Sequence, residues 1–180
     1  YKFAKISISY IKRGVNMGKF IDIILKSVGH GGVTYNPLKG ELALWTMPYF
    51  MIPNETLAFF QKRMIETFGK EAYDVIYLLG EKHGFNATSI LLKKYGLNYS
   101  GNYSFFAGQS DLVGIGSVEV TSSTPTKHYT SIDKNSPLAF AYKDQFPEPQ
   151  IPVDHYLRGL SAGVLMALDG GKLICIEKEC

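Results

Sequence analysis

The chain has 180 residues, of which 46% are hydrophobic and 19% charged, and its formal net charge at pH 7 is +3. This composition indicates one globular domain with a sizeable core and excludes an intrinsically disordered chain. The nineteen Lys and Arg residues are scattered, so no clustered basic face predicts a nucleic-acid partner. No stretch reaches the roughly 18 consecutive apolar residues of a membrane-spanning helix.

The first third of the chain predicts two strands and a short helix. Alternating polar and apolar residues at 2–11 predict a half-buried strand, and apolar spacing near 19–27 predicts the short helix. Residues 40–51 predict a further strand, in which Pro48 indicates either an edge position or the end of the strand.

Residues 54–95 carry the clearest helical pattern. Asn54 is predicted to cap a first helix that Gly69 breaks or bends, and a second helix is predicted to end at Gly84. A third helix is predicted over residues 88–95. The expected apolar faces are Leu57, Phe60, Met64 and Phe68 on the first helix, and Ala72, Val75, Ile76 and Leu79 on the second.

The last third predicts two strands and two helices. Residues 112–122 predict a strand, Ser136 predicts the cap of a short helix, residues 153–168 predict a longer helix, and residues 172–178 predict a final strand. The order of strand, helices, strands, helix and strand predicts a single α+β domain, with an antiparallel sheet and helices packed on one side.

The last thirty residues combine several specific features. Gly159 and Gly163 lie one turn apart on the predicted helix, which predicts that another element packs closely there. A tight turn follows at Asp169-Gly170, and Glu177 and Cys180 lie three residues apart at the end. The flanking charges argue against a membrane role for the glycine pair.

These residues, in this order and spacing, resemble the C-terminal core of the 4-vinyl reductase domain family. The resemblance extends over about residues 52–180 and includes the block Leu79-Gly80-Glu81-Lys82-His83-Gly84. It implies a ligand-binding core at 52–180, and an N-terminal segment at 1–51 that helps form a homodimer. Family members include the input domains of transcription activators that sense aromatic hydrocarbons.

The resemblance also implies a structural zinc site. In the sensors of the family, a Glu-x-x-Cys pair with flanking cysteines holds the metal. Glu177 and Cys180 match that pair, Asp154 stands where the earlier cysteine is expected, and the later cysteine would lie beyond residue 180. Zinc accepts thiolate, imidazole and carboxylate ligands, so Asp154 or the neighbouring His155 can serve as the third ligand. The alternative is that Glu177 is a surface carboxylate and Cys180 an ordinary small residue.

A binding module is the leading functional hypothesis. The chain holds much aromatic mass, no convergent acid–base set, no catalytic nucleophile motif and no nucleotide-cofactor loop. The expected ligand is a small molecule that is apolar or resembles an aromatic hydrocarbon. Aromatic candidates for its contacts are Phe59, Phe60, Tyr73, Tyr77, Phe105, Phe106, Tyr129 and Tyr156.

Two alternatives remain open. One is a vinyl reductase-type enzyme, or its accessory subunit, in tetrapyrrole metabolism. The other is a structural dimer like the vesicle-tethering subunits that share a related fold. His83 is interpreted here as a helix-end histidine favoured by the helix dipole. Two cysteines do not make a disulfide framework, so a reducing cytoplasm is the expected compartment.

Overall fold

The structure is a computed structural model. It describes residues 33–44, 47–49, 52–95, 116, 118–123, 129–133, 135–146 and 152–177. The strand predicted at 2–11 and the helix predicted at 19–27 lie outside these residues, as do Phe105, Phe106 and Cys180. In the described part of the chain, no helix is both long and apolar enough to cross a bilayer.

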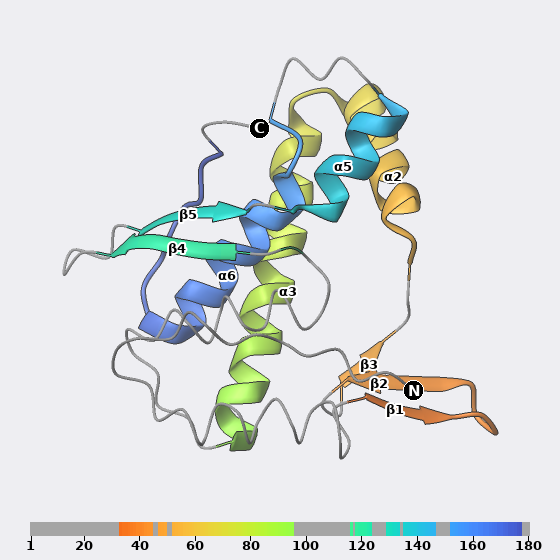
Figure 1. The fold of residues 1–180 in the computed structure, drawn as a ribbon, viewed down its shortest axis with the longest axis vertical. Helices are drawn as coiled ribbons and strands as arrows, with labels where there is room; N and C mark the ends of the chain where they lie inside the picture. Colours follow the sequence, from red (N-terminus) through yellow and green to blue (C-terminus); the bar gives the residue numbers. More distant parts are fainter. Residues whose placement is uncertain are drawn as a thin grey trace, which may run out of the picture.

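The described residues form an α+β fold of helices and two small antiparallel sheets (Figure 1). One sheet has the order β1-β2-β3, with β1 at Val33–Asn36, β2 at Glu41–Leu44 and β3 at Met47–Tyr49. The other pairs β4 at Val118–Ser123 with β5 at Tyr129–Asp133. The helices are α2 at Asn54–Phe68, α3 at Glu71–Tyr95, α5 at Pro137–Gln145 and α6 at His155–Asp169. The predicted fold class is confirmed.

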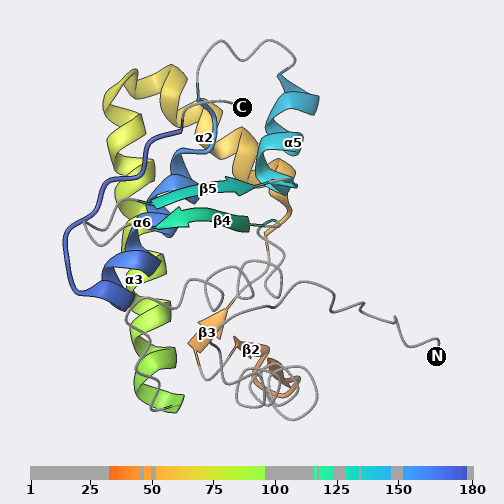
Figure 2. The ribbon, with the colours of Figure 1, turned by 60° about the vertical axis from the view of Figure 1, so that its left-hand side comes forward.

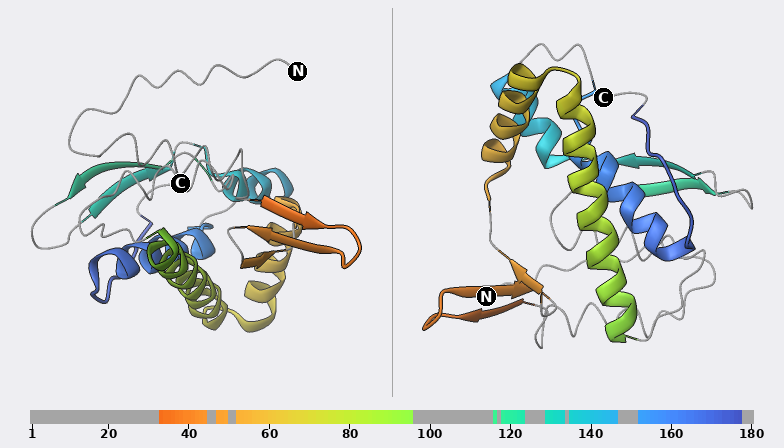
Figure 3. Two further views of the ribbon diagram at one scale, coloured as in Figure 1. Left: turned by 90° about the horizontal axis from the view of Figure 1, so that it is seen from below. Right: turned by 180° about the vertical axis from the view of Figure 1, so that it is seen from behind.

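The layers of the fold are visible in opposite views. In Figure 1 the β4–β5 hairpin lies in front of α6, with α3 behind it; from behind, α3 lies in front of α6 (Figure 3). Helices α2 and α5 pack together at one end of α3 (Figure 2). The β1–β3 sheet lies to the side of α3, near its C-terminal half (Figure 1). Helices α3 and α6 therefore form the centre of the domain, with the β4–β5 sheet on one side of them.

The single strand predicted over residues 40–51 is wrong. β2 and β3 are separate antiparallel strands in which Leu44 pairs with Met47. Only two residues separate that pair, Trp45 and Thr46, and neither is the Gly, Asn or Asp that usually marks a tight turn. The edge position predicted for Pro48 is confirmed, because β3 is the last strand of its sheet.

Two further predictions are wrong: that a helix ends at Gly84, and that a separate helix spans residues 88–95. Helix α3 runs without interruption from Glu71 to Tyr95, and Gly84 lies in its middle. A glycine inside a helix costs about 1 kcal/mol relative to alanine, so tertiary packing must override this local preference. That packing comes from α6, the helix with which α3 makes its most extensive contact.

Two glycine pairs let α3 and α6 touch backbone to backbone. A Cβ atom on Gly80 or Gly84 would clash with the carbonyl oxygen of Tyr156 or Leu160 on α6. In return, a Cβ on Gly159 or Gly163 would clash with a carbonyl oxygen of α3. The close packing predicted for Gly159 and Gly163 is confirmed, and α3 carries a glycine pair with the same i, i+4 spacing.

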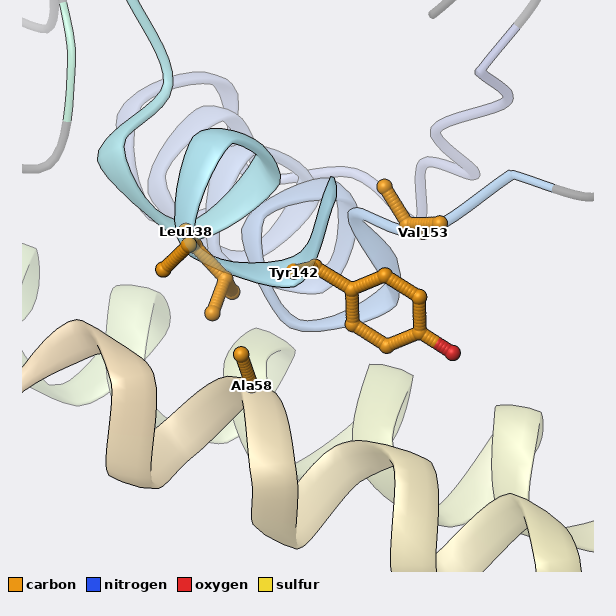
Figure 4. Close-up of a cluster of buried hydrophobic side chains, with 5 residues drawn as sticks. Ala58, Leu138, Tyr142 and Val153 are labelled. Atoms are coloured by element: carbon orange, nitrogen blue, oxygen red, sulfur yellow. The ribbon is translucent and has the colours of Figure 1, made fainter. Parts of the chain in front are cut away.

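A second region of the core joins α2, α5 and the start of α6. Ala58, Leu138, Ala141, Tyr142 and Val153 form a buried cluster, most of which Figure 4 shows. The buried residues of α2 are Ala58 and Gln61, so the apolar face predicted for this helix is displaced. Phe60 and Phe68 were expected inward and are 48% and 56% exposed; on α3, Val75 and Leu79 are 54% exposed.

The ends of α2 and α5 and the C-terminal segment test three local predictions. Helix α2 begins after Pro53 with no side-chain cap, so the cap assigned to Asn54 is wrong. Ser136 does cap α5, because its hydroxyl oxygen accepts a hydrogen bond from the backbone N–H of Ala139 at 3.2 Å. Residues 172–177 form no strand, although Leu173, Cys175 and Glu177 are the more buried residues and alternate with exposed neighbours, as predicted.

Candidate ligand site

Three side chains from three elements meet around His83. The His83 Nε2 atom lies 3.0 Å from the hydroxyl of Tyr49 on β3, and its Nδ1 atom lies 2.5 Å from the hydroxyl of Tyr156 on α6. The histidine ring is tilted against both phenol rings rather than stacked on them, with centroids 6.0 and 6.1 Å away. Both ring nitrogens are therefore engaged at their edges by tyrosine hydroxyls. These three residues are called the Tyr–His–Tyr cluster below.

The glycine contact between α3 and α6 positions this cluster. Gly80 lies against the backbone of Tyr156, and Gly84 lies against that of Leu160. His83 lies between these two glycines in sequence, one turn after Gly80. Because the helices approach so closely, the first turn of α6 brings the Tyr156 hydroxyl within reach of the His83 ring. The same feature that holds the two helices together thus builds the polar cluster.

The cluster is electrically neutral near neutral pH. Burial lowers the pKa of His83 from its ordinary value of 6.5. Burial also raises the pKa of Tyr49, and it raises the pKa of Tyr156 to about 12, with the nearby Tyr49 adding to the effect. A low-dielectric environment disfavours the charged form of each group, which explains all three directions.

The neutral form of His83 gives the hydrogen bonds of the cluster one direction, from donor to acceptor. Its ring carries one N–H donor and one acceptor nitrogen, so one tyrosine must accept from the ring while the other donates to it. The accepting tyrosine keeps its own O–H free to donate elsewhere, and the donating tyrosine keeps oxygen lone pairs that can accept. The chain of three groups therefore offers one donor at one end and an acceptor at the other. This arrangement suits a ligand with a single hydrogen-bonding group.

His83 was wrongly interpreted as a helix-end histidine. It lies in the middle of α3, far from the C-terminal turn where the helix dipole acts. Its hydrogen-bond partners are 34 and 73 residues away in sequence, so no local pattern could reveal them. The available signal was the pair of glycines at i, i+4 beside it, which matches the pair on α6.

The other aromatic candidates have different surroundings. Tyr73 stacks on the ring of His155 with centroids 4.4 Å apart. The Tyr77 hydroxyl accepts a hydrogen bond from the backbone N–H of Cys175 at 2.9 Å, and the Tyr129 hydroxyl donates to Asp169. Phe59 and Phe60 lie on the exposed side of α2. Of the eight aromatic residues proposed from sequence, Tyr156 belongs to the Tyr–His–Tyr cluster.

An open groove elsewhere is a weaker candidate for a ligand site. It is lined by Asn54, Glu55, Asn135, Pro137, Phe140, Ala141, Lys143 and Asp144, at the first turn of α2 and along α5. It shares no residue with the Tyr–His–Tyr cluster. A small-molecule site normally buries most of its ligand and directs a few polar groups inward, and this groove is wide open to solvent.

The start of α6 brings together two of the three residues predicted to bind zinc. The backbone N–H of Asp154 donates to Glu177 Oε2 at 3.2 Å. Burial raises the pKa of the Asp154 carboxyl to about 6; a hydrogen bond with Ser136 opposes this shift, and the charge of Glu177 adds to it. The Asp154 Oδ1 atom is buried with no hydrogen-bond partner. Two carboxylates, one with a buried unpaired oxygen, fit a cation.

The third predicted ligand cannot be placed, because Cys180 lies outside the described residues. Within the described ranges, no group of three His, Cys, Asp and Glu side chains is arranged to hold a metal ion. His155, the alternative ligand, is engaged at one ring nitrogen, while its Nε2 atom is buried with no hydrogen-bond partner. Its Nδ1 accepts a hydrogen bond from Arg158 at 2.8 Å, and its ring is stacked on Tyr73.

Comparison with known proteins relates this arrangement to a solved sensor fold. No protein-family model and no curated protein sequence matches the chain. Among solved structures, the phenol-responsive sensory domain of the transcription activator PoxR, crystallised with phenol, is similar, with a TM-score of 0.75 and 18% sequence identity. The match covers 93% of this chain and 85% of that one. The chain therefore shares the overall fold of that sensory domain.

Proposed function

We propose that this chain is a small-molecule sensor domain whose ligand binds at the Tyr–His–Tyr cluster. The observation that carries the proposal is the partly buried, neutral hydrogen-bond chain from Tyr49 through His83 to Tyr156. A sensor needs a site that recognises one polar group and is otherwise apolar. The proposed ligand is a small, neutral and mostly apolar molecule, of aromatic type, with one hydroxyl-like group.

The charge state of the cluster argues for a neutral ligand. An anion brought into this site would lose its hydration without gaining a cationic partner from these three side chains, because burial keeps His83 unprotonated. A hydrocarbon without a polar group would leave the free ends of the cluster unpaired. A phenol avoids both costs, since its hydroxyl can donate and accept. The similarity to a phenol-responsive domain supports the same ligand class.

Calorimetric titration with three matched compounds tests this proposal. Phenol is expected to bind with one site per chain, while benzoate and toluene bind at least about tenfold more weakly, a difference of about 1.4 kcal/mol. Tyr156→Phe and Tyr49→Phe should each reduce the preference for phenol over toluene. Tyr73→Phe is the matched control, because Tyr73 contacts His155 through its ring. Equal affinity for toluene and phenol in the wild-type protein would refute the proposed role of the cluster.

We further propose a structural zinc ion held by Asp154, Glu177 and Cys180. The support is the buried unpaired oxygen of Asp154 beside Glu177 and the resemblance of the Glu177–Cys180 spacing to a known zinc-binding pair. Bound zinc would fix the start of α6 to the C-terminal segment. Native mass spectrometry of protein purified without chelator should show one zinc per chain, lost in Cys180→Ala. Full zinc retention in that variant would exclude Cys180 as a ligand.

Three further assignments complete the proposal. The chain is a member of the 4-vinyl reductase domain family, which the shared sensor fold and the ordered residues Gly159, Gly163, Glu177 and Cys180 support. It works as a homodimer, with residues 1–51 contributing to the contact. It acts in the cytoplasm, in line with a free thiol at Cys175. Sedimentation of the purified protein and localisation of a tagged chain test the last two.

A further inference from the structure

Helix α3 carries exposed apolar residues on the face that is turned away from α6. Its inner face packs on α6 through Gly80 and Gly84. On the opposite face Val75, Leu78 and Leu79 are 54%, 56% and 54% exposed, and Phe85 and Ile90 are 39% and 40% exposed. A helix at the surface of a monomer normally presents polar residues outward, and a helix apolar all round is normally buried on both sides. The five residues named here are called the outer stripe of α3.

The spacing of the outer stripe suits a second helix. The five residues of the outer stripe lie on one side of α3 over about four turns, and two exposed polar residues, Lys82 and Asn86, lie between them on the same side. Figure 3 shows this helix as the foremost element in the view from behind, with α6 on its far side. A helix laid along this side would bury the stripe.

The charges at the two ends of α3 identify the partner helix. The first turn carries Glu71 and Asp74, and the last turn carries Lys93 and Lys94. Two copies of α3 running antiparallel would place the acidic turn of each copy beside the basic turn of the other. Such a two-fold contact is self-complementary, as the interface of a symmetric homodimer must be. A parallel arrangement would instead oppose like charges at both ends.

We infer that the outer stripe of α3 is an interface on which a second copy of this chain docks, with the two α3 helices antiparallel. This assigns the homodimer contact to a surface inside the 52–180 core, beyond the N-terminal segment to which the sequence pointed. It depends on the proposed homodimer and not on the ligand site, because none of the three residues of the Tyr–His–Tyr cluster belongs to the outer stripe.

The geometry also predicts the weak point of this interface. The midpoint between the acidic and basic turns falls near Lys82, an exposed residue in line with the stripe. In the antiparallel pair the two Lys82 side chains lie near the two-fold axis, where like charges repel. A polar residue in such a helical seam fixes the register and lowers the stability of the pair. Removing this charge should therefore strengthen the dimer.

Analytical ultracentrifugation of the full chain tests the inference through variants with opposite expected effects. Lys82→Leu should lower the dimer dissociation constant by about tenfold or more, the effect of about 1.4 kcal/mol. Leu79→Asp should raise it by at least about tenfold, since it places charge in the apolar seam. Phe140→Asp is the control, because Phe140 is 62% exposed on α5, away from the stripe, and its replacement should change nothing.

A charge-exchange experiment tests whether the charges at the two ends of α3 hold the pair together. A chain with Glu71→Lys and Asp74→Lys should not self-associate, and neither should a chain with Lys93→Glu and Lys94→Glu. Mixed together, the two should form a heterodimer, because each acidic turn then meets a basic one. Circular dichroism confirms that each variant is folded.

Three results would overturn the inference: a wild-type monomer at all accessible concentrations, a dimer unaffected by Lys82→Leu and Leu79→Asp, or the failure of the exchanged chains to pair. The phenol titration is independent of these results, so failure of the dimer and failure of the ligand site are distinguishable.

Discussion

Gly84 of α3 lies directly against the backbone carbonyl of Leu160 on α6, in a space that no Cβ atom can enter. The contact is one of four of this kind, two from each helix, and together they hold α3 and α6 against each other. The Tyr–His–Tyr cluster depends on it, because His83 precedes Gly84 and bonds to the first turn of α6.

Replacing Gly84 by alanine should destabilise the domain strongly. The substitution gains about 1 kcal/mol of helix propensity, but the new methyl group must push two backbones apart, at a cost of about 3 kcal/mol or more. The steric cost should therefore exceed the gain in helix propensity, and the free energy of unfolding measured with urea should fall by about 2 kcal/mol. Gly170→Ala is a useful comparison. Gly170 has φ +69° and open space around it, so only about 1–2 kcal/mol of backbone strain is expected. A Gly84→Ala variant as stable as the wild-type protein would contradict the close packing of α3 on α6.

Stability should fall in mild acid because of His83. Burial lowers its pKa in the folded protein, so the unfolded chain binds protons more readily. The contribution of His83 is complete above its ordinary pKa of 6.5 and is lost as the pH falls below that value. The variant His83→Gln, which keeps a donor and an acceptor but cannot be protonated, should show a shallower loss between pH 7 and pH 5. Burial lowers the pKa of His155 to about 4 in the wild-type protein, so its contribution is common to both chains. Identical pH profiles would argue against a buried His83.

The tyrosines of the cluster should be energetically coupled. Tyr49→Phe or Tyr156→Phe alone leaves one nitrogen of His83 unpaired, at a cost of about 1–2 kcal/mol for a buried polar atom. The two hydroxyls share one ring, and one must donate while the other accepts. The stability lost in the double variant should therefore differ from the sum of the two single losses by at least about 0.5 kcal/mol. A double-mutant cycle from thermal or urea unfolding measures this. Strict additivity would mean that the two hydroxyls act independently.

Alkaline unfolding should report on Tyr156. Burial raises its pKa to about 12, so the folded state holds the phenol proton more tightly than the unfolded chain does. The associated stability is complete below the ordinary pKa of 10 and is lost as the pH rises toward about 12. In an ultraviolet titration Tyr49, Tyr77 and Tyr142 should also ionise late, because burial raises the pKa of each. Tyr156→Phe should remove the last step, which accompanies unfolding. A variant that keeps the last step would assign it to another tyrosine.

Ser136→Ala should weaken the attachment of α5. Its hydroxyl oxygen accepts from the Ala139 N–H at the start of the helix, and replacement of such a cap costs about 1 kcal/mol. Ser136 is also hydrogen-bonded to Asp154, so the loss should exceed that of an ordinary cap. Ser136→Thr, which retains the hydroxyl, should recover most of the stability in the same unfolding assay. If both variants unfold alike, the hydroxyl has no capping role.

Local signals predicted the elements that depend on neighbouring residues. Ser136 marked the start of α5, and the period of apolar residues gave α6 close to its observed bounds. The glycine pair of α6 was correctly linked to close packing. The equivalent pair on α3 was missed, because a glycine beside a histidine also fits a helix end, and only the helix lying across it decides between the two.

The candidate site was harder to predict for the same reason. Tyr49, His83 and Tyr156 belong to three elements, and nothing in the sequence around any of them specifies the other two. The start of α6 was easier, since the resemblance to a known family placed Asp154 and Glu177 in one site, and the structure brings them into hydrogen-bond contact. The role of Cys180 remains a prediction.

The central claim is that a neutral ligand hydroxyl binds at His83. Nitrogen-15 NMR of the histidine rings, with His83 assigned through His83→Gln, tests it most directly. Saturating phenol should shift the His83 ring nitrogens and leave the ring neutral and in a single tautomer, because the ligand pairs one end of the hydrogen-bond chain. Phenol that binds and shifts backbone amides elsewhere, while the His83 nitrogens stay unchanged, would contradict the account.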